Sequence, residues 1–167
     1  ALYIGEISRE MQARYPEEER PAGFVPDADF IFGGQIEGGA HALFHIYTAG
    51  NFYAPTTLAP YVQIGEQKYG KPILDRILTS DTDLETAARC GLVSMDSTTR
   101  SNASVGPPIE VMMFRAGAPG DFVHMIFDED DPYLRHLRQA WAEHLMQAFD
   151  SLPPIKLSPP KVRAVEN

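Results

Sequence analysis

The chain has 167 residues, of which 44% are hydrophobic and 22% charged, as in an ordinary globular domain that buries a core. Its formal net charge of −9 argues against nucleic-acid binding, because neutralising phosphates requires a basic surface. No apolar run reaches membrane-spanning length and no signal segment opens the chain, so we expect no membrane partner. The single cysteine, Cys90, excludes an intramolecular disulfide and favours a reducing, cytoplasmic location.

Hydrophobic periodicity predicts a helix over residues 2–14, followed by a loop rich in proline over residues 16–27. Four strand-like runs come next, at residues 29–36, 41–48, 52–57 and 61–64. Both alternating faces of the run 41–48 are largely apolar, which is typical of a strand covered on both sides. This part of the chain therefore predicts a layered architecture of antiparallel strands and outer helices.

Two further helices are predicted at residues 71–78 and from residue 84 to about residue 95, the second opened by a capping box of Thr82 and Glu85. Strands follow at residues 109–115 and 122–127. Asp131 and Pro132 then form a good N-cap and first position for a last helix. Residues 152–167 show no periodicity and predict an extended or disordered tail, which leaves a single domain over residues 1–151.

Hydroxyl, carboxylate and guanidinium side chains gather in residues 94–106, between a predicted helix and a predicted strand. In one interpretation these polar residues only cap and terminate the helix. In the other, Asp96 and Thr99 stand three positions apart on one helical face and jointly hold a polar group. The residues by themselves favour the cap. Glu66, at another junction between a strand and a helix, is a second polar candidate.

Metal and cofactor sites are not predicted. His41 and His45 on one strand would lie about 13 Å apart, too far to share an ion. The glycine pairs at residues 33–34 and 38–39 lack the strand–GxGxxG–helix setting of a dinucleotide site, and no clustered Cys/His spacing occurs.

A family likeness is carried by FGGQI (32–36), IYTAGNF (46–52), QIGEQKYGKPILDR (63–76), the stretch 96–106 and DDPY (130–133). These segments resemble the bacterial proteasome-related peptidases called Anbu, or ancestral beta subunits, over nearly all of residues 1–150. The resemblance implies an α+β fold of the N-terminal-nucleophile hydrolases, an αββα sandwich with antiparallel sheets. It also implies that this chain is the C-terminal part, without the first strands and the first helix.

In that superfamily the nucleophile is the hydroxyl of an N-terminal Thr or Ser, and the α-amine of the same residue is the base. The resemblance therefore implies amide hydrolysis of a peptide or small amide substrate in a homo-oligomer, either a ring or an open helical assembly. The nucleophile would lie upstream of Ala1, so we expect the 167-residue chain alone to be inactive. The other hypothesis is a non-catalytic structural or assembly module.

The family pattern places an Asp and a Ser or Thr three residues later near the terminal amine, and Asp96 and Thr99 match that pair by spacing and position. Glu66 follows Gly65 where proteasome subunits carry a serine. Ser101 is a further candidate in the same stretch. The resemblance thus makes residues 94–106 a supporting wall of the site.

Overall fold

The structure is a computed structural model that describes residues 1–155 except 119 and 121. Its helices and strands are α1 (Leu2–Arg14), the 3-10 helix η1 (Glu17–Glu19), β1 (Phe30–Gln35), β2 (His41–Ile46), β3 (Phe52–Tyr53), α2 (Lys71–Ile77), α3 (Leu84–Ser101), β4 (Ile109–Phe114), β5 (Phe122–Phe127) and α4 (Pro132–Asp150). The fold is α+β with antiparallel sheets, as the sequence predicts. The predicted tail lies, from residue 156 onward, outside the described residues.

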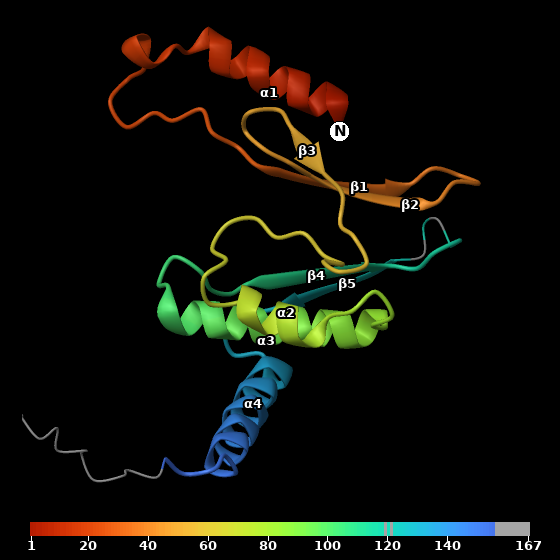
Figure 1. The fold of residues 1–167 in the computed structure, drawn as a ribbon, viewed down its shortest axis with the longest axis vertical. Helices are drawn as coiled ribbons and strands as arrows, with labels where there is room; N and C mark the ends of the chain where they lie inside the picture. The colour runs from red at the N-terminus through yellow and green to blue at the C-terminus, as the bar shows by residue number, and fades with distance from the viewer. Residues whose placement is uncertain (119, 121, 156–167) are drawn as a thin grey trace, which may run out of the picture.

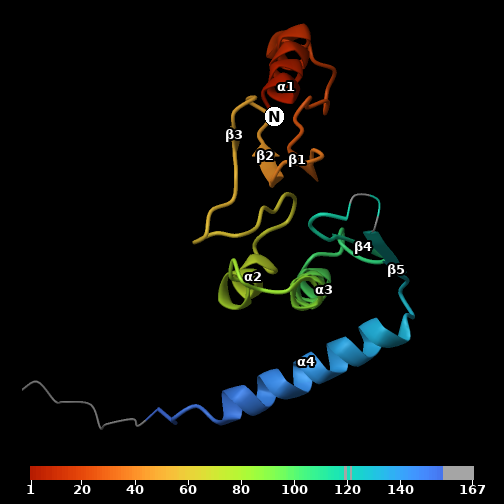
Figure 2. The same ribbon diagram turned by 90° about the vertical axis from the view of Figure 1, so that its right-hand side faces the viewer.

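The elements are stacked in layers (Figure 1). Helix α1 lies outside a sheet of order β1-β2-β3, the hairpin β4-β5 follows, and α2 and α3 lie beyond it. Helix α4 lies beneath α2 and α3 in the view turned by 90° (Figure 2). The order of layers is therefore helix, sheet, sheet, helices.

The core lies where α3, the hairpin β4-β5 and the first half of α4 meet. Its buried members are Leu92, Ile109, Phe127 and Leu134. Side chains alternate along a strand, so the residues of β4 and β5 that face away from this core share the opposite face of the hairpin. That face carries exposed apolar side chains, at Met112, Phe114, Phe122 and Ile126.

The chain exposes 12913 Å² in total. A compact globular chain of this length exposes about 8,000 Å². Phe30, Ile31 and Phe32 of β1 are also exposed. Much apolar surface on the two sheets is thus left uncovered by the described residues.

Two predicted strands differ from the structure. Residues 61–64 form no strand, and the predicted run 52–57 is shortened to the two residues of β3. Pro55 and Pro60 have no backbone N–H to donate to a neighbouring strand. Between them, Thr56 and Ala59 instead bond to each other in a tight turn. The chain therefore crosses to α2 as an irregular segment.

Helix α3 is longer than the sequence predicts, and it includes Asp96, Thr98 and Thr99. The hydroxyls of Thr98 and Thr99 donate to the carbonyl oxygens of Ser94 and Met95, four residues earlier, at 2.9 Å each. Polar side chains that bond back within the helix do not terminate it. The cap interpretation of Asp96 is therefore wrong, because the helix continues to Ser101 and its C-cap is Asn102.

The N-cap of α3 is Asp83, and the predicted capping box of Thr82 and Glu85 is wrong. The Asp83 carboxylate accepts the N–H of Thr86 at 2.8 Å, whereas the Thr82 hydroxyl accepts the N–H of Thr79 in the preceding turn. The hydrogen bond from the Thr86 backbone lowers the pKa of Asp83 below its usual value. A carboxylate at this position also interacts favourably with the N-terminal end of the helix dipole.

We expect Asp83→Ala to lower the melting temperature at pH 7, and Asp81→Ala, two residues before the N-cap, to change it little. Because the pKa of Asp83 is lowered in the folded state, its stabilisation is complete above the unfolded pKa of about 4. It is lost as the pH falls through the folded pKa. Thermal unfolding of both variants from pH 7 to pH 2 checks this, and a deficit of Asp83→Ala that persists unchanged at pH 2 would contradict it.

Candidate functional site

Asp96 lies on the side of α3 that faces α4. Its side chain is 9% exposed. One carboxylate oxygen accepts a hydrogen bond from Nε of Arg138 on α4, at 2.6 Å. The other oxygen accepts a hydrogen bond from Nε of Arg100, one helical turn later, at 3.2 Å. Both oxygens of Asp96 therefore bind arginines. The ion pair of Asp96 and Arg138, which are 42 positions apart in the sequence, joins α3 to α4.

Thr99 and Ser101 lie on the last two turns of α3. The Thr99 hydroxyl donates to Met95, within the helix, and Ser101 is exposed at the last helical residue. Asp96 and Thr99 share no hydrogen-bond partner among the described residues. Asp96 and Thr99 thus lie on one helix, as predicted, but their side chains do not bind a common polar group among the described residues.

Glu66 meets Asn102, which sequence reasoning did not single out. The Asn102 side-chain N–H donates to Glu66 Oε2 at 3.2 Å, across 36 positions of the sequence. Glu66 Oε1 accepts the backbone N–H of Lys68 at 2.8 Å, and the other end of the Asn102 amide accepts the N–H of Ser104 at 2.9 Å. Each oxygen of the Glu66 carboxylate has one donor, which fixes its orientation.

This arrangement can hold a positive charge or a hydrogen-bond donor. A carboxylate oxygen has two lone pairs, and each Glu66 oxygen uses one on the donors described above. Glu66, on the irregular segment between β3 and α2, and Asn102, at the C-cap of α3, are both half-buried. The neighbouring Gln63 has a buried side-chain oxygen that finds no hydrogen-bond partner within the part of the chain that the structure describes. We call the polar contact of Glu66, Asn102 and the adjoining Gln63 at the end of α3 the polar seam.

A metal site is not formed by the described residues, among which no group of three His, Cys, Asp or Glu side chains lies close enough to hold an ion. Within the same part of the chain, no helix has both the length and the apolar character to cross a membrane. Cys90 is buried, and burial raises the pKa of its thiol, which favours a structural role over a reactive one.

An open groove lies between the two sheets. It has a volume of about 790 Å³ and is lined by residues of β1, β2 and β4, among them Gly33, Leu43, Phe44 and Phe114. Its lining is largely apolar, apart from side chains such as Gln35 and Arg115. The groove is the place where the exposed faces of the sheets approach each other.

The fold and the seam define a chain of α+β class with two antiparallel sheets between helices. No family model and no curated protein matches the sequence, but solved structures do. Anbu (ancestral beta-subunit) from Yersinia bercovieri is 42% identical over 95% of this chain and 65% of its own, with a TM-score of 0.79. The helical assembly of the Anbu complex from Pseudomonas aeruginosa is 41% identical over 98% and 66%, with a TM-score of 0.83.

A selenomethionine-labelled Anbu mutant from Hyphomicrobium sp. strain MC1 is 30% identical over 94% of this chain and 82% of its own, with a TM-score of 0.66. The chain belongs to the Anbu family. It spans only 65% and 66% of the Yersinia and Pseudomonas chains, as expected for a C-terminal part. The family predicted from the five sequence segments is thereby confirmed.

Proposed function

We propose that this chain is the C-terminal part of a proteasome-like peptidase subunit that hydrolyses amide bonds with an N-terminal Thr or Ser nucleophile. In this proposal the nucleophile belongs to a segment upstream of Ala1, and the complete fold is the αββα sandwich of the N-terminal-nucleophile hydrolases. The single observation that carries the proposal is the oriented Glu66 carboxylate in a member of the Anbu family.

The open groove supports the location of the missing part. The relatives continue beyond the portion that this chain matches, and additional strands beside the groove of about 790 Å³ would extend the two sheets of the αββα sandwich. The exposed apolar faces of β1 and of the hairpin β4-β5 would then be covered more fully. We propose that the upstream segment supplies these strands and brings the terminal amine to Glu66 and Asn102.

The Glu66 carboxylate has a defined part in this reaction. When the nucleophile attacks, its hydroxyl proton passes to the terminal α-amine, which titrates near pH 8 and accepts it at neutral pH without large tuning. An oriented carboxylate stabilises the ammonium that forms, and Asn102 holds that carboxylate in place. Glu66 is thus the proposed contact to the amine, and Asn102 a positioning residue. For Asp96, Thr99 and Ser101 a supporting role stays a prediction.

The proposed partners are further copies of the same subunit and a peptide or small amide substrate, in the cytoplasm. The Pseudomonas relative forms a helical assembly, which supports a homo-oligomer for this chain. The proposal includes neither a metal nor another cofactor, because the terminal amine itself supplies the base.

The alternative function is a non-catalytic assembly module. It is favoured by the use of Asp96, which binds two arginines and joins α3 to α4, a structural role rather than a chemical one. In that case the subunit would assemble but hydrolyse nothing.

Activity measurements separate the two functions. We expect the complete polypeptide to hydrolyse members of a panel of fluorogenic peptide and amide substrates, and the 167-residue chain to hydrolyse none. Replacing the first Thr or Ser by Ala in the complete polypeptide should abolish turnover while leaving its mass in solution unchanged. Hydrolysis by that Ala variant, or by the repurified 167-residue chain, would overturn the proposal.

A further inference from the structure

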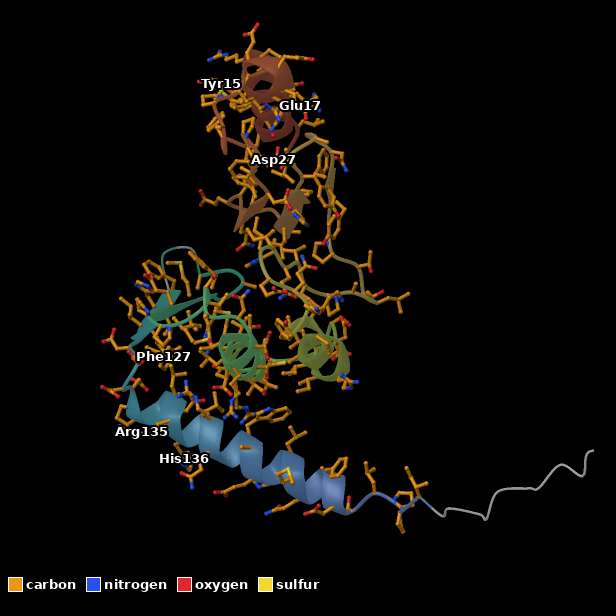
Figure 3. All side chains as sticks on the ribbon, turned by 90° about the vertical axis from the view of Figure 1, so that its left-hand side faces the viewer. Tyr15, Glu17, Asp27, Phe127, Arg135 and His136 are labelled. Atoms are coloured by element: carbon orange, nitrogen blue, oxygen red, sulfur yellow. The ribbon has the colours of Figure 1, made fainter. Side chains whose placement is uncertain are left out.

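The segment that carries Glu66 lies along one face of α3. Ser94, Thr98 and Asn102 are spaced four residues apart and therefore follow one face of that helix. Glu66 contacts Asn102 at one end of this line, and Gly70 lies against Ser94 and Thr98 at the other end. Helices α2 and α3 lie side by side here and are seen nearly end-on in Figure 2 and Figure 3. The segment thus runs antiparallel to α3.

Gly70 approaches α3 closely. It is buried at the N-cap of α2. A Cβ at this position would overlap Ser94 Oγ, and it would lie 2.9 Å from Thr98 Oγ1 and 3.0 Å from the carbonyl oxygen of Ser94. Ser94 and Thr98 are themselves buried. A side chain at residue 70 would therefore push the start of α2 away from α3.

The oxygens that face Gly70 have little freedom to move aside. The Thr98 hydroxyl donates to the carbonyl oxygen of Ser94 at 2.9 Å, so these two oxygens are held within the helix. The Ser94 hydroxyl can rotate, but its carbonyl oxygen is backbone. Because an ordinary contact between a methyl carbon and an oxygen is longer than these distances, an added Cβ would displace the segment by about 0.5 Å.

Hydrogen bonds within the segment transmit such a displacement to Glu66. The N–H of Lys71 donates to the carbonyl oxygen of Gln67 at 3.1 Å, and the Gln67 side chain donates to the carbonyl oxygen of Gln63 at 2.8 Å. The Gln63 side chain in turn donates to the carbonyl oxygen of Glu66 at 3.3 Å. The segment from Gln63 to Lys71 is therefore one hydrogen-bonded unit.

The contact between Glu66 and Asn102 tolerates little displacement. It is 3.2 Å long, and a separation of about 3.6 Å is no longer a hydrogen bond. A group that acts in catalysis has to be held within about 0.5 Å of its productive position. We infer that Gly70 is a positioning residue for Glu66, because without a side chain it lets the segment lie close enough to α3 for Asn102 to hold the carboxylate. This inference rests on the proposed function, in which Glu66 stabilises the ammonium form of the terminal amine.

Gly70→Ala in the complete polypeptide tests this role. We expect kcat to fall about 10²-fold, with a much smaller effect on KM. The acid limb of kcat/KM reports the pKa of the terminal amine, and a nearby carboxylate raises that pKa, so the limb should move about 1 pH unit lower. Gly91→Ala is the matched control, since a Cβ there meets no described atom within 4 Å. It should keep the parent kcat and acid limb.

Two combined variants test whether Gly70 acts through Ser94 and on Glu66. Ser94→Ala removes the hydroxyl that a Cβ at residue 70 overlaps, so adding it to Gly70→Ala should raise kcat roughly tenfold and reverse part of the shift in the acid limb. In the Glu66→Gln background, Gly70→Ala should lower kcat no further, because the displaced side chain no longer carries a charge. Losses that multiply in that background, or no recovery with Ser94→Ala, would overturn the inference.

A merely structural role of Gly70 predicts a different result. Gly70→Ala would then lower the melting temperature but leave kcat and the acid limb unchanged, and this outcome would overturn the inference. If Gly70→Ala does not fold by circular dichroism, its combination with Ser94→Ala is compared with Ser94→Ala alone. Thr98 Oγ1 and the Ser94 carbonyl oxygen still crowd the Cβ, so a smaller shift of the limb to lower pH supports the inference and equal limbs contradict it.

Failure of the proposed function would be seen separately, because neither the parent nor any variant would then hydrolyse the substrates. The pKa of the terminal amine can still be measured, by competitive acetylation and mass spectrometry of the N-terminal peptide. A lower pKa in Gly70→Ala than in the parent and in Gly91→Ala would support the positioning role without any turnover. Equal values in the three proteins would overturn it.

Discussion

Glu66→Gln is expected to lower kcat of the complete polypeptide about 10²-fold, with a much smaller effect on KM. The amide has the size of the carboxylate, but its single oxygen can keep the N–H of either Lys68 or Asn102 and not both in their present positions. It has no negative charge with which to stabilise an ammonium. Because only one partly exposed hydrogen bond is lost, the melting temperature should fall by no more than about 4 °C. Steady-state kinetics with a fluorogenic amide and thermal unfolding of the same preparation provide the measurement.

Asp96→Asn is the matched carboxylate-to-amide change at the other candidate, and we expect the opposite result. It removes the charge that binds Arg138 and Arg100, so stability should fall by about 1–2 kcal/mol. This is less than for a fully buried pair, because the side chains of Arg138 and Arg100 are 40% and 55% exposed. The value of kcat should stay within about twofold of the parent. A large loss of kcat at unchanged melting temperature would instead assign the contact with the terminal amine to Asp96, as the family pattern predicts.

Gly5→Ala is expected to destabilise the protein by about 2 kcal/mol, which lowers the melting temperature by roughly 5 °C. Helix α1 approaches the turn after β2 so closely that a Cβ at Gly5 overlaps the carbonyl oxygen of Gly50 and lies 3.0 Å from its carbon. The obstacle is backbone and cannot rotate away. Gly50 has a φ of +82°, a conformation that only glycine adopts readily, so the turn cannot easily rearrange.

Gly91→Ala is the matched control for that variant, since Gly91 is also a glycine inside a helix. No atom of residues 1–155, apart from the undescribed 119 and 121, lies within 4 Å of a Cβ at Gly91. Alanine should therefore stabilise α3 by up to about 1 kcal/mol through helix propensity alone. Thermal unfolding of both variants gives the comparison. Equal shifts of the two in the same direction would show that helix propensity, not the contact with Gly50, decides the effect at Gly5.

Local patterns in the sequence predict most of the fold. The apolar spacing of α1 and α4 and the N-cap at Asp131 depend on neighbours within a few residues, and the structure confirms them. The antiparallel pair β1 and β2 also agrees with the strand-like runs at residues 29–36 and 41–48. Residues 61–64 were mispredicted, because four residues with strand propensity form no strand when the prolines beside them disrupt the pairing.

Local sequence patterns do not predict which polar side chains of the candidate site contact each other. The residues alone predict the family, most helix boundaries and a cluster of polar side chains in residues 94–106. Which of these polar groups meet depends on the packing of distant segments, because Asp96 binds Arg138, 42 positions away, and Glu66 binds Asn102, 36 positions away. Spacing along one helix shows which side chains share a face but not what lies opposite that face. That depends on how α3 packs against α4 and against the segment that precedes α2.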